Sequence, residues 1–392
     1  MTGKRSYDIV LFGATGFTGG LTAEYLARNA PANLRWALAG RSLAKLEEVR
    51  AALARTNPGC AALDLLQADT GNAESIRKVA DSARVVITTV GPYILHGEPL
   101  VAACAAGGTD YVDLTGEPEF VDLMWLRYHE QAQKSGARLV HCCGFDSIPH
   151  DLGALFTVQQ LPSVGAIKLE GFVRAGGTFS AGTYHSAVNA FGRMRQYAAV
   201  RKERFKREGA PIGRKVSSTS QKIRFDKALK TWVVPMPTID PQVVKRSARG
   251  LAAYGPDFSY GHYVQVKKLS SVLGLVGGVS TLFGLAQLKL TRDWLLARKS
   301  SGEGPSEERR KKSWFRVRFI GEGSGKRVVT EVTGGDPGYG ETSKMLAESA
   351  LSLALDSLPK TSGQLTPAVA LGDALIARLQ KAGIQFRVVE AA

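Results

Sequence analysis

The stretch YDIVLFGATGFTG occupies residues 7–19 and decides the fold of the first part of the chain. Its apolar run, 7–12, leads directly into a glycine turn, after which Leu21, Tyr25 and Leu26 recur at helical spacing. This order predicts a strand, a tight turn and a helix. A phosphate can approach a backbone closely only where side chains are absent, and the N–H groups at a helix start favour an anion.

Each glycine of the turn has an expected role. Gly13 permits the tight turn, Gly16 lets a pyrophosphate approach, and Gly19 lets the helix pack on the strand. The spacing G-x-x-G-x-x-G departs from the commoner G-x-G-x-x-G, but its place between a strand and a helix predicts a dinucleotide site. A glycine turn that serves structure alone is the alternative. The residues expected to bind the cofactor here are Gly13, Thr15, Gly16, Phe17, Thr18 and Gly19.

Strands and helices alternate as far as about residue 150. Further apolar runs, each followed by a helical pattern, predict strands at 34–39, 61–68, 85–90, 111–114 and 138–141. Such alternation is typical of α/β folds with a doubly wound parallel sheet of the Rossmann type. We therefore expect residues 1–150 to form a nucleotide-binding domain.

The pattern changes beyond Pro149. Strands without a crossover helix between each pair are expected at 167–174, 231–235, 262–266, 315–320 and 327–333. A mixed sheet in a second, α+β domain over residues 151–342 fits this order and would hold the substrate. Helical patterns at 343–358 and 367–381 predict that residues 343–392 form C-terminal helices that pack back on the first domain.

Charge separates two regions of the chain. The 392 residues carry a formal net charge of +16, and 30 basic against 10 acidic side chains fall between Arg193 and Arg327. This basic region suits an anionic lipid, a phosphate-bearing substrate or an acidic carrier protein, and a solvated surface is the plain alternative. Nucleic acid is not an expected partner, because no helix-turn-helix, zinc-finger or RNA-binding motif accompanies the charge.

The four cysteines are Cys60, Cys104, Cys142 and Cys143, and their spacing is not that of a metal site. No metal is expected. Few cysteines, together with N-terminal residues that lack the pattern of a signal peptide, indicate a reducing, cytoplasmic location.

The segment 269–288, LSSVLGLVGGVSTLFGLAQL, carries no charge and is flanked by Lys267, Lys268 and Lys289. Its length could span a bilayer as a helix. A helix that dips into the membrane interface, and a helix that is buried or lines an acyl site, are the alternatives. A span is not expected, and both a peripheral contact with the inner face of the plasma membrane and a buried or acyl-lining helix stay open.

The residues after the second strand predict which dinucleotide binds. An NAD-preferring site has an acidic residue there, about twenty residues past the glycines, for the ribose hydroxyls. Arg41 and Ser42 stand at this position instead. A guanidinium and a hydroxyl suit a 2′-phosphate, which predicts NADP(H). Two further turns are expected to contact the cofactor, at Asp69 near the adenine and at Gly91, Pro92 and Tyr93 beside the nicotinamide ribose.

Six motifs carry a resemblance to a known family: GATGFTG (13–19), AGRS (39–42), TTVGPY (88–93), DLTGE (113–117), GFDSIPHDLG (144–153) and GGDPGYGET (334–342). With them the chain resembles the saccharopine dehydrogenase-like oxidoreductases, and more narrowly the bacterial trans-acting enoyl reductases of cell-envelope lipid synthesis. The resemblance implies NADPH-dependent reduction of a carbon–carbon double bond in a polyketide-type acyl chain. A separate synthase or carrier protein would present that chain.

Reduction of an enoyl thioester places negative charge on the carbonyl oxygen and requires a proton at the α-carbon. The candidate catalytic residues are His150, Tyr93, Asp146 and Tyr339. His150 is the best acid by residue type, because the imidazole group has an intrinsic pKa near neutral pH, and Tyr93 or Tyr339 could donate a hydrogen bond to the enolate. Packing roles are the alternative, since Asp146 and Ser147 could cap the helix that begins near Pro149.

Three functions are consistent with the sequence. The first is a reductase acting on a lipid-like chain, which uses the dinucleotide turn, the basic region and the apolar segment together. The second is a saccharopine-type dehydrogenase acting on a carbon–nitrogen bond, which leaves the apolar segment unexplained. The third is a non-catalytic, lipid-associated protein that holds NADPH. The sequence leaves the oligomeric state open.

Overall fold

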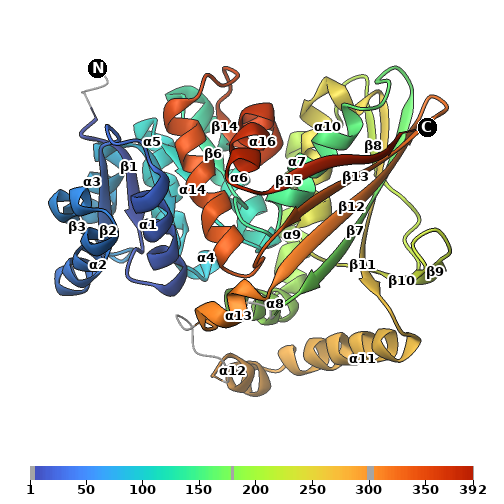
Figure 1. Cartoon of the computed structure of the whole chain (residues 1–392), viewed down its shortest axis with the longest axis horizontal. Helices are drawn as coiled ribbons and strands as arrows, with labels where there is room; N and C mark the ends of the chain where they lie inside the picture. The colour runs from blue at the N-terminus through green and yellow to red at the C-terminus, as the bar shows by residue number, and fades with distance from the viewer. Residues whose placement is uncertain (1–4, 178–180, 298–303, 392) are drawn as a thin grey trace. The chain divides into compact units, whose positions relative to one another are not determined.

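The computed structural model describes residues 5–177, 181–297 and 304–391 of the chain (Figure 1). The chain divides into two compact units. The first unit comprises Met1–Phe145, Gly302–Gly304 and Gly338–Ala382, and the second comprises Asp146–Ser301, Pro305–Pro337 and Gly383–Ala392. Each unit contains one large sheet.

The first unit holds a seven-stranded sheet in the order β14-β6-β5-β4-β1-β2-β3, and all its strand pairs are parallel. This confirms the predicted doubly wound sheet. The sheet grows outward in both directions from the neighbours β1 and β4, and folds of this kind bind ligands at the carboxyl edge of such a switch point. The strands are β1 (Tyr7–Phe12), β2 (Trp36–Gly40), β3 (Asp64–Gln67), β4 (Ala83–Thr88), β5 (Asp110–Val112), β6 (Arg138–Val140) and β14 (Gly363–Leu365).

Helices connect these strands and bury their side chains. Ile9, Val10 and Leu11 of β1 are fully buried, as expected for a parallel strand covered on both faces. Ser42 caps one helix by accepting a hydrogen bond from the Lys45 N–H (3.3 Å). The helices are α1 (Phe17–Asn29), α2 (Leu43–Thr56), α3 (Ala73–Ser82), α4 (Tyr93–His96), α5 (Glu98–Gly107), α6 (Pro118–Ser135), α14 (Gly340–Leu355), α15 (Pro367–Ala370) and α16 (Gly372–Lys381), with a 3-10 turn at Pro58–Ala62.

The second unit contains the expected mixed sheet, in the order β15-β13-β12-β7-β11-β10-β9, with β8 paired to β11. Strands β7 and β11 run parallel, whereas β12 is antiparallel to both β7 and β13. Ser324 and Gly325, both with positive φ, form the tight hairpin between β12 and β13. The strands are β7 (Ala166–Gly176), β8 (Lys215–Ser218), β9 (Arg224–Asp226), β10 (Thr231–Pro235), β11 (Asp257–Val266), β12 (Trp314–Gly323), β13 (Lys326–Gly334) and β15 (Gln385–Ala391).

The helices of the second unit differ sharply in burial. Ten of the residues in α7 are buried, and this helix contacts β7, β12 and β13. In α11 only Val272 and Ala286 are buried, and Figure 1 shows most of this helix lying away from the sheet of its unit, although it contacts β10, β11 and α8. The helices are α7 (Ile148–Val158), α8 (Ala181–Gly192), α9 (Met194–Glu208), α10 (Asp240–Gly250), α11 (Leu269–Ala286), α12 (Lys289–Ala297) and α13 (Glu307–Lys311), with a 3-10 turn at Ala252–Tyr254.

Residues 343–392 were expected to form helices alone, but they also contain the strands β14 and β15. Helices α14, α15 and α16 lie in the first unit, where α14 contacts α1 and β4. Strand β15 instead pairs antiparallel with β13 in the second unit. Only Phe386 is buried in β15, so its apolar pattern is too sparse to predict a strand.

Candidate active site

The glycine turn joins β1 to α1, and two of its glycines are required by the fold itself. Gly13 has φ +94°, a left-handed conformation that favours glycine. A Cβ atom on Gly19 would lie 2.1 Å from the Gly13 carbonyl oxygen, so no side chain fits there. These contacts let α1 begin directly against the end of β1.

Gly16 differs from its two neighbours because packing does not require a glycine there. The nearest atom to a Cβ on Gly16 would be the Gly13 carbonyl oxygen at 3.5 Å, an ordinary contact. Gly16 is exposed and occupies the N-cap of α1 without a side-chain cap. Thr15 beside it is also exposed. The bare backbone at a helix N-terminus is the arrangement that admits a phosphate group.

Phe17 and Tyr339 lie together beside this turn. Their ring centroids are 4.9 Å apart in an edge-to-face arrangement. Tyr339 occupies the N-cap position of α14, and the Ser343 hydroxyl one turn later donates to the Thr18 carbonyl oxygen (3.4 Å). The first unit therefore brings the start of α14 to the predicted cofactor turn.

Arg41, Ser42 and Asp69 follow the neighbouring parallel strands β2 and β3, at the same carboxyl edge. Arg41 is exposed, and across residues 5–177, 181–297 and 304–391 its guanidinium forms no ion pair. The Ser42 hydroxyl oxygen caps α2, which leaves its O–H able to donate. Asp69 accepts a hydrogen bond from the Gly71 N–H (2.8 Å).

Tyr93, with Gly91 and Pro92 before it, begins α4 at the end of β4, and its side chain does not face an open site. The residue is 4% exposed, and its hydroxyl donates to the Thr88 carbonyl oxygen (3.1 Å). Burial, and next the charge of Asp113, raise the pKa of Tyr93 well above its usual value. This corrects the expectation that Tyr93 donates to an enolate, because its hydroxyl is already bound inside the fold.

Two buried carboxylates from the DLTGE motif hold the loops at this edge. Glu117 accepts hydrogen bonds from the Tyr93 and Ile94 N–H groups that begin α4 (2.9 Å each). Asp113 accepts from the Cys142 N–H (3.0 Å), and His141 Nδ1 lies 2.6 Å from it. Neither carboxylate is among the site residues predicted from the sequence, although the position of Asp113 directly after a buried strand is a usable signal.

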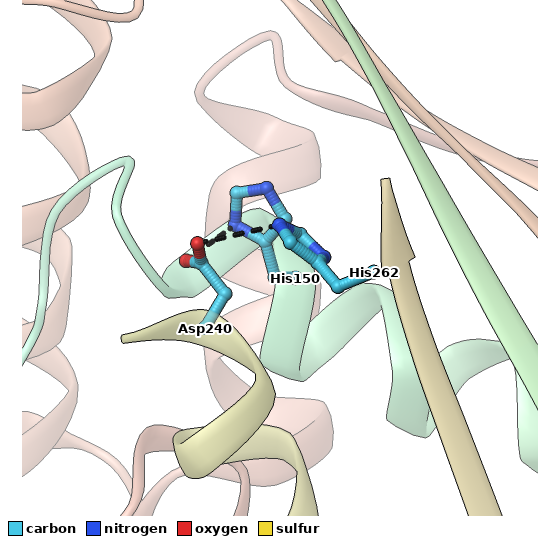
Figure 2. Close-up of side chains that lie close together, drawn as sticks. All are labelled: His150, Asp240 and His262. Atoms are coloured by element: carbon cyan, nitrogen blue, oxygen red, sulfur yellow. Dashed lines mark ion pairs between the residues drawn. The ribbon is translucent and has the colours of Figure 1, made fainter. Parts of the chain in front are cut away.

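In the second unit, His150, Asp240 and His262 form a buried cluster (Figure 2). They come from α7, the start of α10 and β11. His150 Nδ1 lies 3.1 Å from Asp240 Oδ1, and His262 Nε2 lies 3.4 Å from Asp240 Oδ2. The Asp240 carboxylate therefore sits between two imidazoles. Of these three residues, only His150 was predicted from the sequence as a site residue.

Burial and charge act against each other in this cluster. Burial alone would raise the pKa of Asp240, but the imidazoles of His150 and His262 lower it below the usual range. Burial lowers the pKa of His262, against the opposing effect of Asp240. The Tyr260 hydroxyl, 3.1 Å from His262 Nδ1, fixes the orientation of that ring. Asp240 is therefore the ionised member of the cluster.

Asp146 lies close enough to the cluster for the charges of Asp240 and His150 to change its pKa. Burial, and next the charge of Asp240, raise the pKa of Asp146 to about 6, although His150 acts in the opposite direction. Ser147 occupies the N-cap of α7 without a side-chain cap bond, and its hydroxyl donates to the Asp146 carbonyl oxygen. The capping role considered for Ser147 is therefore wrong.

The same cluster could hold a cation. His150, Asp240 and His262 each offer one donor atom, and these atoms lie within 4.8 Å of one another. Two imidazoles and a carboxylate form a donor set found in catalytic zinc sites. Cysteine spacing gave no indication of such a site.

Comparison with known proteins identifies the family. Residues 9–140 match the family model described as the saccharopine dehydrogenase NADP binding domain. The chain is 38% identical, over 99% of both lengths, to a Mycobacterium tuberculosis protein provisionally named a trans-acting enoyl reductase. It is 33% identical to the saccharopine dehydrogenase-like oxidoreductase of Bos taurus, over 99% of this chain and 98% of that one. The chain belongs to the saccharopine dehydrogenase-like oxidoreductases.

This member of the family also has a solved structural neighbour. Apo saccharopine dehydrogenase (L-Glu forming) from Saccharomyces cerevisiae matches with a TM-score of 0.56 and 14% identity, over 98% of this chain and 100% of that one. The likeness supports the two-sheet architecture of the saccharopine dehydrogenase-like fold. Because the sequence identity is only 14%, this similarity supports the fold and nothing further.

Family membership makes this chain an NADP-dependent oxidoreductase with NADP(H) as its cofactor, as predicted. The residues present fit that group. Gly16 leaves exposed backbone that a Cβ would otherwise cover, and Arg41 presents an exposed guanidinium at the end of β2. An acidic residue would repel a 2′-phosphate at the position that Arg41 occupies.

Proposed function

We propose that this oxidoreductase is an enoyl reductase that saturates a carbon–carbon double bond in a lipid-like acyl thioester. The observation that carries the proposal is the His150–Asp240 pair at 3.1 Å, which offers a proton source suited to protonating carbon. The full-length relative from Mycobacterium tuberculosis, with a provisional name describing this activity, supports the choice of reaction.

The cofactor-binding residues are proposed as follows. NADPH, when bound, supplies the hydride that adds to the β-carbon of the enoyl group. The backbone at Gly16 would hold the pyrophosphate, and Arg41 with the Ser42 O–H would hold the 2′-phosphate. The remaining contacts come from Gly13, Thr15, Phe17, Thr18 and Gly19 around the turn, Asp69 at the adenine, and Gly91 and Pro92 at the nicotinamide ribose.

His150 is the proposed general acid. Its imidazolium gives a proton to the α-carbon, which with the added hydride turns the double bond into a single bond. The ionised Asp240 stabilises that imidazolium through one carboxylate oxygen, and its other oxygen lies near the His262 ring. Asp146, with a pKa near 6, is the proposed group that returns a proton from water to the cluster.

Tyr339 is the proposed donor to the thioester oxygen. Tyr339 occupies the N-cap position of α14, and its buried ring packs on Phe17 of the cofactor turn. A hydrogen bond to the carbonyl oxygen would stabilise the charge that develops there as hydride adds. Both tyrosine side chains are buried, with Tyr339 6% and Tyr93 4% exposed, so the choice of Tyr339 rests on its position beside the cofactor turn.

A separate synthase or carrier protein is the proposed source of the acyl chain. The strongly basic region from Arg193 to Arg327 would attract an acidic carrier domain at low ionic strength. Salt should therefore weaken the interaction.

Single-turnover oxidation of NADPH tests the reaction. The enzyme is mixed with NADPH and either a trans-2-enoyl thioester of N-acetylcysteamine or an imine formed from glutamate and an aldehyde. We expect oxidation and a saturated thioester, identified by mass spectrometry, only in the first case. Faster turnover of the imine would establish the carbon–nitrogen dehydrogenase instead. NADPH binding without oxidation of either substrate, or of thioesters with other chain lengths, would support the non-catalytic alternative.

Variants at the cluster test the assignment of the acid. His150→Gln should slow the single turnover by about 100-fold or more while the NADPH dissociation constant stays the same. The matched control is His96→Gln, which replaces an exposed histidine of the first unit. Metal analysis of the purified enzyme belongs with this experiment, since stoichiometric zinc lost together with activity in His262→Gln would reassign the cluster as a metal site.

A further inference from the structure

Helix α11 exposes an apolar surface that the second unit does not cover. Its eighteen residues, Leu269–Ala286, include no charged side chain, and only Val272 and Ala286 are buried. Leu273 is 67% exposed, and Val276, Val279 and Phe283 are each about two-fifths exposed. Beyond the helix, Leu288 and Leu290 are 66% and 86% exposed. Patches of this kind mark an interaction site.

In the middle of α11 the exposure extends around the helix rather than along one stripe, whereas its last turn packs against α8. Every residue from Leu273 to Thr281 is exposed. Because successive residues are about 100° apart around an α-helix, these positions cover all its faces. Among the residues that the structure describes, no atom lies within 4 Å of where a Cβ would stand on Gly274, Gly277 or Gly278. A helix that is apolar on all sides needs an apolar surrounding, not one partner on one face.

We propose that α11 and α12 dock the second unit onto an anionic lipid surface, with α11 lying along the boundary between headgroups and acyl chains. A second copy of this chain is the weaker occupant, because one packed helix would cover only part of the circumference. Lipid chains can surround a helix on every side that the protein leaves open. This proposal goes beyond the proposed reaction and does not depend on it.

Both ends of α11 are held by the same unit, which favours a helix that lies flat. Near its start, the helix contacts β10 and β11. Near its end, Gln287 donates to the Phe191 carbonyl oxygen of α8 (2.9 Å). The following helix α12 returns to α8, where the Tyr184 hydroxyl donates to the Leu295 carbonyl oxygen (3.2 Å). A spanning helix would place its two ends on opposite sides of the bilayer.

Charge around α11 fits an anionic surface. Lys267 and Lys268 precede the helix, Lys289 and Arg292 follow it, and no acidic residue lies between Lys267 and Arg292. Basic side chains at helix ends can extend to headgroups while their aliphatic stems stay in the apolar layer. Trp294 on α12 is 51% exposed, and tryptophan is favoured at this depth.

Vesicle flotation of the full chain tests the proposal. Phosphatidylcholine vesicles, with and without phosphatidylglycerol, are mixed with the wild-type protein and with the double variant Leu273→Asp/Val276→Asp. We expect the wild type to float with phosphatidylglycerol vesicles, and the double variant to bind them about tenfold or more weakly, since charge is costly in the apolar layer. Both positions are exposed, so thermal unfolding of the variant should match the wild type.

Two controls complete the experiment. Ile212→Asp removes another fully exposed apolar side chain of the same unit and should leave flotation unchanged. Lys267→Glu/Lys268→Glu should weaken binding to phosphatidylglycerol vesicles, and added salt should also weaken the binding of the wild type. Failure of the wild type to float with either vesicle overturns the proposal. So does a dimer that the Leu273→Asp/Val276→Asp change dissociates while flotation is unaffected.

Discussion

The ring of Tyr339 packs edge-to-face on the ring of Phe17, with centroids 4.9 Å apart. Phe17 is the first residue of α1, directly after the glycine turn, and Tyr339 directly precedes α14. The contact therefore links the predicted phosphate-binding turn to a segment near the end of the chain. It joins two motifs, GATGFTG and GGDPGYGET, that the sequence shows only as separate stretches.

Two substitutions at Tyr339 separate its ring from its hydroxyl. Tyr339→Ala removes the aromatic pair, worth about 1 kcal/mol, and should raise the NADPH dissociation constant about fivefold. Tyr339→Phe keeps the ring, so cofactor affinity should stay the same while the rate of thioester reduction falls about 10- to 100-fold. Fluorescence titration and single-turnover kinetics measure the two effects. Equal reduction rates for Tyr339→Phe and the wild type would show that Tyr339 does not donate a hydrogen bond to the thioester oxygen.

The three glycines of the turn should respond differently to alanine. Gly16→Ala should fold with a melting temperature close to that of the wild type, because its Cβ meets nothing closer than 3.5 Å. Its NADPH affinity should fall about tenfold or more, since the methyl group covers the backbone that the phosphate approaches. Gly19→Ala should lose most of its stability, because the new Cβ would stand 2.1 Å from a carbonyl oxygen. If Gly16→Ala bound NADPH normally, the pyrophosphate would not lie at this turn.

Arg41 should decide the preference for NADPH over NADH. A charge-assisted hydrogen bond to the 2′-phosphate contributes about 1.5–3 kcal/mol, so Arg41→Ala should weaken NADPH binding about 10- to 100-fold. NADH lacks that phosphate, and its affinity should change little. Arg55→Ala, at the far end of α2, is the matched control. Parallel losses for NADPH and NADH in Arg41→Ala would show that the guanidinium does not read the 2′-phosphate.

The sequence predicts best what depends on neighbouring residues. Strand β1 occupies Tyr7–Phe12 as predicted, because a continuous apolar run is what a strand buried on both faces requires. The roles of Gly13 and Gly19 were also predictable, because the backbone conformation of Gly13 and the close packing of Gly19 both arise within the turn itself. Strand β14 escaped prediction because three residues show too little periodicity, and β15 because six of its seven residues are exposed and give no buried apolar run.

Site residues that depend on distant partners were predicted less well. His150 was recognised from its motif. Its partner Asp240 looks like an ordinary acidic residue at the start of a helix, and His262 looks like an ordinary residue within a strand. Tyr93 was placed correctly after β4, yet the direction of its side chain is set by contacts with Thr88 and Leu114. Such contacts arise from the tertiary fold, which spacing in the sequence does not encode.

Asp146 should leave a signature in the pH dependence of stability. Its pKa is about 6 in the folded protein, against about 3.9 in an unfolded chain. Between these values the folded state binds more protons than the unfolded state, so stability falls as pH rises and is lower by about 3 kcal/mol above pH 6. Asp146→Asn cannot ionise and should lack this loss. The variant should therefore become more stable, relative to the wild type, between pH 4 and pH 7.5.

Urea unfolding at a series of pH values measures that difference. The informative quantity is the free energy of unfolding of Asp146→Asn minus that of the wild type, because other titrating groups contribute to both proteins. Asp293→Asn, which changes an exposed aspartate of the same unit, should track the wild type throughout. A difference that stays constant from pH 4 to pH 7.5 would mean that Asp146 is ionised over the whole range, and it could then not return protons to His150 near neutral pH.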